Sequence, residues 1–143
     1  MLRQLLTGGL VSLGNIAIHA VVMAAVVTTG RRAGKRKNTH PQVWLATVMV
    51  ATVGILLLAH TAEVITWALA YLILDVVSPD VDVLYFAFVN YTTLGYGDVV
   101  PAERWRLLGP IAAMNGVLLF GWSTAVIFEV LRHAMRIRDT GEA

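Results

Sequence analysis

The chain has 143 residues, of which 57% are hydrophobic and only 14% are charged, and its formal net charge is +2 at pH 7. This composition excludes an ordinary soluble domain and favours an integral membrane protein. The sequence contains no cysteine, so neither a disulfide framework nor a thiolate metal site can form.

Three apolar segments follow one another along the chain: Leu5 to Thr29, Val43 to Leu74 and Leu107 to Leu131. Each exceeds the roughly 20 residues that cross a hydrocarbon core. We therefore expect an all-α membrane protein with three spanning helices. The expected ranges are an N-terminal helix within residues 1–30, an outer helix at 42–75 and an inner helix at 105–133, followed by a short tail at 134–143.

Basic residues near the ends of these segments predict the orientation in the membrane. The loop at 31–41 contains Arg31, Arg32, Lys35, Arg36 and Lys37 and no acid. Such clusters prefer the cytoplasmic side, so we expect the N-terminus outside and the C-terminus in the cytoplasm, in a cell inner (plasma) membrane. We interpret the basic loop as a topological anchor, with a binding site for anionic lipid as the alternative.

The region between the outer and inner helices predicts a half-helix that dips into the membrane. Ser78 or Asp80 can cap the start of this helix, and Pro79 suits its first turn. The apolar run that continues to Tyr91 is too short to span a bilayer, so we expect a pore helix at 79–91.

An irregular segment, TTLGYGD, follows at residues 92–98. Its glycines, Gly95 and Gly97, can adopt backbone angles that other residues avoid. Irregular backbone inside a bilayer leaves carbonyl groups without partners unless they line an enclosed cavity or bind something else. A dehydrated cation can fill that role.

The string TLGYG resembles the selectivity filter of potassium channels. In two-helix bacterial members of that family the inner helix has a glycine hinge followed by a Phe-Gly pair. Gly116 resembles the hinge, and Phe120 and Gly121 resemble the pair. The resemblance covers residues 43 to about 132, and the first segment has no counterpart in those channels. It implies a homotetramer around a fourfold pore axis, because this chain holds one filter copy and the family uses four.

The resemblance also implies roles for individual residues of the filter. Potassium ions would be coordinated at Thr93, Leu94, Gly95, Tyr96 and Gly97. Supporting residues would be Thr92 at the filter base, Asp98 as an outer cap, Tyr85 as the holder of that aspartate, and Asn90 as the nearest polar support for the Tyr96 hydroxyl. Leu94 stands where valine is commoner.

The inner helix is expected to line the cavity and carry the gate. Gly116 is a candidate hinge, and a close helix contact is an equally weighted alternative. Asn115 would face water or form an interhelical hydrogen bond. Helical spacing predicts a cavity-facing row that ends at a hydrophobic constriction: Val117, Phe120, Thr124 and Phe128.

Two ionisable residues, His60 and Glu63, interrupt the second apolar segment, one turn apart on one helix face. Ionisable groups at this depth are costly and are functional candidates by default. Three interpretations stay open: a structural pair facing the pore domain, a proton sensor that uses the histidine, and a metal site shared with His19. The structural pair is favoured, because two or three ligands without a spacing motif are a weak signal for a metal.

The sequence thus predicts a passive potassium-selective channel whose ligand is the potassium ion. The alternatives are a weakly selective cation channel and a non-conducting membrane subunit that retains a filter-like loop. No enzyme motif is present, so we expect neither catalysis nor a small-molecule substrate. Basic residues without interleaved aromatics argue against a nucleic-acid partner.

Overall fold

The computed structural model describes the backbone of residues 1–33 and 40–140, and its regular elements are helices. There are three long helices, α1 (Leu2–Ala33), α2 (Pro41–Ile73) and α4 (Leu108–Thr140). The short helix α3 (Val83–Tyr91) and the 3-10 turn η1 (Glu103–Trp105) lie between α2 and α4. The long helices are long and apolar enough to cross a membrane. The predicted all-helical fold with three spanning helices is therefore confirmed.

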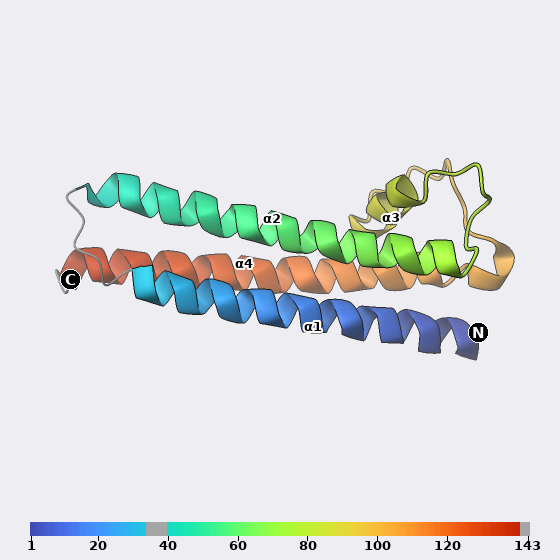
Figure 1. The fold of residues 1–143 in the computed structure, drawn as a ribbon, viewed down its shortest axis with the longest axis horizontal. Coiled ribbons are helices and arrows are strands. Elements are labelled where there is room, and N and C mark those ends of the chain that lie inside the picture. The colour runs from blue at the N-terminus through green and yellow to red at the C-terminus, as the bar shows by residue number, and fades with distance from the viewer. Residues whose placement is uncertain (34–39, 141–143) are drawn as a thin grey trace.

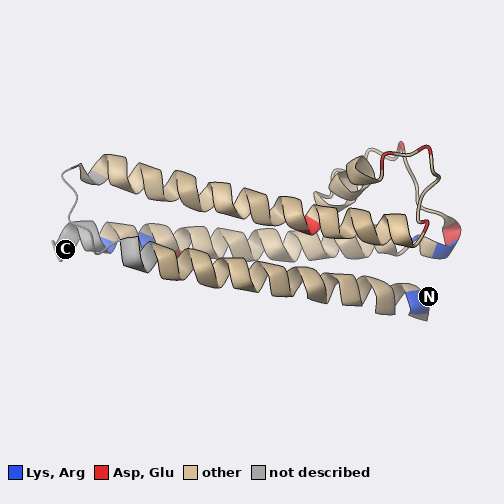
Figure 2. Cartoon of the chain, in the orientation of Figure 1, with Lys and Arg blue, Asp and Glu red and all other residues tan. Residues whose placement is uncertain are grey.

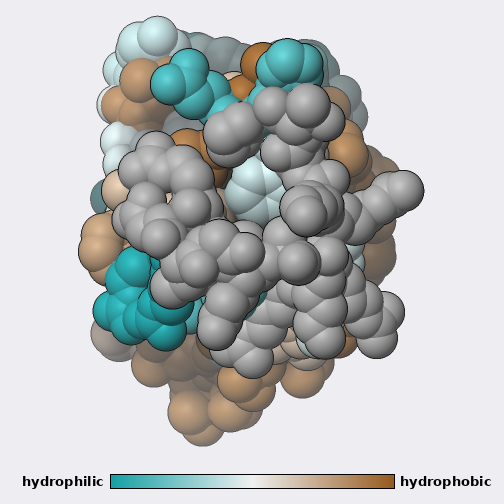
Figure 3. Space-filling view, turned by 90° about the vertical axis from the view of Figure 1, so that its left-hand side faces the viewer, coloured by the Kyte–Doolittle hydropathy of each residue, from teal (hydrophilic) through white to brown (hydrophobic). Residues whose placement is uncertain are grey.

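The long helices run side by side, and the segment with α3 lies at one end of them, together with the N-terminus (Figure 1). The C-terminal end of α4 lies at the opposite end (Figure 1). Acidic residues gather near α3, and one further acid marks the middle of α2 (Figure 2). Viewed from the C-terminal end, apolar residues cover much of the outer flank (Figure 3). This distribution suits a bundle surrounded by lipid.

Helix α1 packs against both α2 and α4 of its own chain. Its buried residues recur at helical spacing, as Asn15, His19, Met23 and Val26. Two apolar clusters complete the core. The one beneath α3 includes Trp67, Tyr71, Phe86, Tyr91 and Leu108, and the one toward the C-terminal end includes Met23, Val26, Leu56, Val126 and Val130.

Helix α2 ends two residues before the predicted boundary at 75, because its last turn closes in a Schellman motif. The amide of Val76 donates to the carbonyl of Tyr71 at 3.0 Å, and Asp75 takes a left-handed conformation with φ 49°. The chain then leaves the helix axis and turns toward α3.

Helix α3 begins at Val83, four residues after the predicted start, so the predicted caps Ser78 and Asp80 are wrong. The carboxylate of Asp82 caps the helix instead, accepting from the amides of Leu84 and Tyr85 at 3.0 and 3.1 Å. The carbonyl of Ser78 accepts from the amide of Val81 at 3.1 Å, which places Pro79 between them in a turn outside the helix.

Helix α4 also differs from its predicted range of 105–133. Trp105 belongs to η1, and α4 begins at Leu108 and continues to Thr140, through most of the predicted tail. The sequence contains neither glycine nor proline from Trp122 to Thr140, so nothing local ends the helix earlier.

The basic loop, interpreted as a topological anchor with lipid binding as the alternative, falls largely outside the described residues. Lys35, Arg36 and Lys37 lie in the undescribed segment, and the side chains of Arg31 and Arg32 are also outside the description.

Candidate functional site

The filter segment begins where α3 ends in a second Schellman motif. The amide of Leu94 donates to the carbonyl of Val89 at 2.9 Å, and that of Thr93 donates to Asn90 at 3.0 Å. This motif requires a left-handed residue, and Thr93 occupies that position with φ 62°. For a β-branched residue the conformation is strained by about 1–3 kcal/mol, and such strain is concentrated at functional sites.

Beyond this point the sign of φ alternates along the filter. Thr93, Gly95 and Gly97 have φ values of 62°, 59° and 80°, whereas Leu94 and Tyr96 are not among the residues with positive φ. Alternation in the sign of φ turns successive peptide groups toward the same side of the chain. Leu94 and Tyr96 are 52% and 69% exposed, so this single chain leaves the segment open to contacts from outside.

The outer end of the filter is tied to α3 by one side-chain hydrogen bond. The hydroxyl of Tyr85 donates to the carboxylate of Asp98 at 2.7 Å, so the structure brings this predicted pair together. Accepting that proton, the Asp98 carboxylate raises the pKa of Tyr85 above its ordinary value.

Two other predicted supports bind within α3. The Thr92 hydroxyl donates to the carbonyl of Phe88 at 2.7 Å. The side-chain amide nitrogen of Asn90 donates to the carbonyl of Phe86 at 2.9 Å, and the side-chain oxygen lies against Gly109 of α4. Asn90 is thus directed toward α3 and α4 instead of toward the Tyr96 hydroxyl.

The predicted cavity residues of α4 are exposed on the single chain: Val117, Phe120, Thr124 and Phe128. Asn115 differs from them, because it is only 2% exposed. Its oxygen accepts from Asn15 of α1 at 3.0 Å and from Trp67 of α2 at 3.1 Å. Asn115 therefore forms the interhelical hydrogen bond that was the alternative to a cavity position.

Gly116 is buried directly against the C-terminal end of α3. A Cβ added at this position would overlap the carbonyl oxygen of Tyr91. Glycine lets the two backbones approach here, as small residues do where membrane helices pack closely. Helix α4 continues through this position without interruption.

A buried polar cluster surrounds Glu63, and we call it the Glu63 cluster: His19, His60, Glu63, Tyr91 and Ser123. One carboxylate oxygen meets Nδ1 of His19 at 2.8 Å, and the other meets Nδ1 of His60 at 2.9 Å. The Tyr91 hydroxyl also donates to Glu63. Oγ of Ser123 lies 2.9 Å from Nε2 of His60 and 3.4 Å from Nε2 of His19. The cluster thus joins all four helices.

The distances in this cluster favour shared protons over a shared metal. Ligand atoms of His19, His60 and Glu63 all lie within 4.8 Å of one another, which meets the loose requirement for a metal group. However, two ligands on one tetrahedral zinc, each at 2.0–2.1 Å, lie about 3.3 Å apart. The shorter nitrogen–oxygen distances of 2.8 and 2.9 Å are those of hydrogen bonds.

The sequence pattern singles out only part of this cluster. His60 and Glu63 are conspicuous inside an apolar segment, and His19 is the corresponding residue of the first segment. Tyr91 and Ser123 are missed, because a tyrosine in an aromatic run and a serine in a spanning helix are both ordinary.

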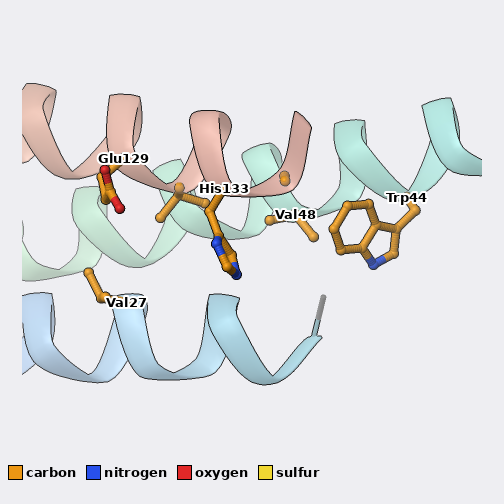
Figure 4. A pocket seen from close by; sticks show the side chains of 7 residues that line it. Val27, Trp44, Val48, Glu129 and His133 are labelled. Carbon is orange, nitrogen blue, oxygen red and sulfur yellow. The ribbon is translucent and has the colours of Figure 1, made fainter. Parts of the chain in front are cut away.

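A crevice at the other end of the bundle is too small to be a ligand site. It lies between Val27, Trp44, Val48, Glu129 and His133, with the last two side chains directed away from α4 (Figure 4). Its volume of about 10 Å³ is that of a single water position.

A family model described as an ion channel matches residues 59–133, which is more than half of the chain. The match extends from the middle of α2, through α3 and the filter segment, into α4. No curated protein and no solved structure matches the sequence. The chain therefore belongs to the ion channel family, as a pore of the two-helix type with a further helix before it, and conducts ions passively.

Proposed function

We propose that the chain is a potassium-selective channel that works as a homotetramer in the plasma membrane. The observation that carries this proposal is the positive φ at every second residue directly after α3, at Thr93, Gly95 and Gly97. Peptide groups turned to one side give a column of carbonyl oxygens. Such a column replaces the hydration shell of a potassium ion when several copies face one another.

The exposure of the filter and of one α4 face supports assembly around a common axis. One chain supplies one wall of the pore. Side chains that face the pore or a neighbouring copy are therefore exposed when a single chain is considered. Leu94 and Tyr96 of the filter and Val117, Phe120 and Phe128 of α4 are all exposed apolar residues. In the proposed tetramer these α4 residues line the cavity and its gate.

Charge and chain direction support an orientation with the N-terminus outside. The filter end of the bundle carries the N-terminus and the acidic residues near α3 (Figure 2). Arg132 and Arg136 lie toward the other end of α4, and basic residues favour the cytoplasmic side. The C-terminal end of α3 then points inward, where its partial negative charge attracts a cation below the filter.

A weakly selective cation channel is the second candidate, and one observation favours it. The side-chain amide of Asn90 donates to the carbonyl of Phe86 instead of contacting the Tyr96 hydroxyl. A filter with less support around its tyrosine holds its carbonyls less firmly and discriminates less between potassium and sodium.

The test is the reversal potential of the purified protein in planar bilayers, with potassium on one side and sodium on the other. We expect reversal near the potassium equilibrium value and no current from Gly95→Asp, because a side chain at φ 59° distorts the filter. Gly54→Ala is the control, since an added Cβ there meets no atom within 4 Å. Reversal near zero would identify the weakly selective channel, and silence in every lipid would favour a non-conducting subunit.

A further inference from the structure

We propose that the Glu63 cluster positions the base of the filter, and that one proton shared between His19 and His60 keeps it in place. Conduction then depends on pH through a buried site in the middle of the bundle. Glu63 and the two histidines are positioning residues, because they reach the filter only through Tyr91. The inference deepens the proposed channel function and rests on it.

Tyr91 is the physical link between the cluster and the filter. It is the last residue of α3 and directly precedes Thr92 and Thr93. Its hydroxyl donates to Glu63, and its carbonyl oxygen lies against Gly116. The residue is fully buried, so both its side chain and its backbone are held. Loss of the hydroxyl contact therefore frees the residue from which the filter starts.

Charge balance requires one proton more than neutral histidines provide. Glu63 and His19 are both fully buried, in helices that span the membrane. An ionised carboxylate in such a place is very costly unless a positive charge compensates it. In the described part of the chain the ion-pair partners of Glu63 are His19 and His60.

The hydrogen bonds of the cluster agree with this proton count. With Glu63 ionised and both imidazoles neutral, the Nδ1 protons and the Tyr91 proton complete the bonds to the carboxylate. The Ser123 proton then completes the 2.9 Å bond to Nε2 of His60. The 3.4 Å contact between Ser123 and Nε2 of His19 is left without a proton. One added proton completes this contact and also cancels the charge of Glu63.

Each helix contributes to the surroundings of this proton. His19 comes from α1, His60 and Glu63 from α2, Tyr91 from α3 and Ser123 from α4. Aromatic rings of α4 cover both imidazoles: the Phe120 ring centroid is 4.5 Å from that of His60, and the Trp122 centroid is 5.3 Å from that of His19. The His60 side chain is 12% exposed on the single chain, and this is the side from which we expect protons to reach the cluster.

The expected pH dependence has two limbs. As pH rises, loss of the shared proton leaves the Glu63 carboxylate uncompensated. As pH falls, a second proton gives the cluster a net positive charge and removes an acceptor nitrogen. Conduction should therefore be greatest at intermediate pH and decline on both sides.

The experiment compares open probability from pH 5 to 9 for the full chain and three variants in bilayers. Tyr91→Phe removes one hydroxyl, and we expect open probability at pH 7 to fall about tenfold with most of the pH dependence lost. Glu63→Gln removes the charge that holds the proton, and its profile should be flat. Tyr71→Phe is the matched control, because this buried hydroxyl belongs to α2 but contacts Leu108, and it should keep the wild-type profile.

A measurement without conduction tests the proton itself. Imidazole ¹⁵N NMR of the protein in lipid nanodiscs at pH 7 should show one positive charge shared by His19 and His60, lost in Glu63→Gln. Two neutral rings, two charged rings or a wild-type profile in Tyr91→Phe would overturn the inference. A wild-type reversal potential near zero would instead reject potassium selectivity, while the pH profile of the cation current still tests the cluster.

Discussion

Replacement of Gly116 by alanine tests the close contact between α4 and the end of α3. The added Cβ would overlap the main-chain carbonyl of Tyr91, which cannot rotate away as a flexible side chain can. Overpacking typically lowers the free energy of unfolding by about 1–3 kcal/mol. Because the overlapping atom here belongs to the rigid main chain, we take the upper end, about 3 kcal/mol. Alanine recovers about 1 kcal/mol through its higher helix propensity. We therefore expect a net loss of about 2 kcal/mol.

The assay is reversible unfolding in mixed detergent micelles, followed by circular dichroism as the denaturing detergent is increased. A loss of this size lowers the ratio of folded to unfolded chains by about 30-fold. Gly54→Ala provides the control. No atom lies within 4 Å of its added Cβ, so that variant should be as stable as the wild type or slightly more stable.

Equal stability of Gly116→Ala and Gly54→Ala would refute this reasoning. If Gly116→Ala then also showed altered opening at normal stability, the glycine would act as a hinge. This pair of variants therefore distinguishes a hinge from a close helix contact at Gly116, which the sequence alone could not do.

Three further predictions concern hydrogen bonds. Tyr85→Phe frees Asp98 and should raise sodium permeability in reversal-potential measurements. Asp98 raises the pKa of Tyr85 in the folded protein, so their hydrogen bond stabilises the fold below pH 10 and this stabilisation is lost as pH rises through the folded-state pKa. The tyrosinate absorbance of Tyr85, identified as the part that Tyr85→Phe removes, should therefore develop above pH 10. Asp82→Ala should cost about 1 kcal/mol in chemical unfolding, with no change in Asp80→Ala, because only Asp82 caps α3. Asn115→Leu removes the acceptor of the buried Trp67 Nε1–H, whereas the side-chain amide of Asn15 keeps its bond to the carbonyl of Glu63. We therefore expect a loss of stability of about 1–3 kcal/mol, measured as a lower unfolding midpoint.

Much of the fold follows from local patterns. Apolar segments longer than a bilayer predict the three spanning helices, and the short run before TTLGYGD predicts α3. The boundaries are less predictable, because several residues can cap the same helix. Ser78, Asp80 and Asp82 are all suitable by type, and only the path of the turn after α2 gives the cap to Asp82.

The side chains that meet inside the bundle are harder to predict. In a soluble helix an apolar stripe marks the buried face, but in a membrane helix the outward face is apolar too, so periodicity does not show which side is inside. Asn115 illustrates the difficulty. Its polarity suits both a cavity and an interhelical bond, and the rotation of α4 toward Asn15 and Trp67 decides between them.

The sequence by itself determines the number of spanning helices and the filter-like segment, because length, hydropathy and glycine position are local properties of the chain. It also singles out His60 and Glu63, since a charged group is conspicuous where lipid surrounds the chain. Only the tertiary structure brings His19, Tyr91 and Ser123 to the same carboxylate. Their meeting depends on how four helices are rotated and crossed, and close packing, unlike hydropathy, has no signature along a single chain.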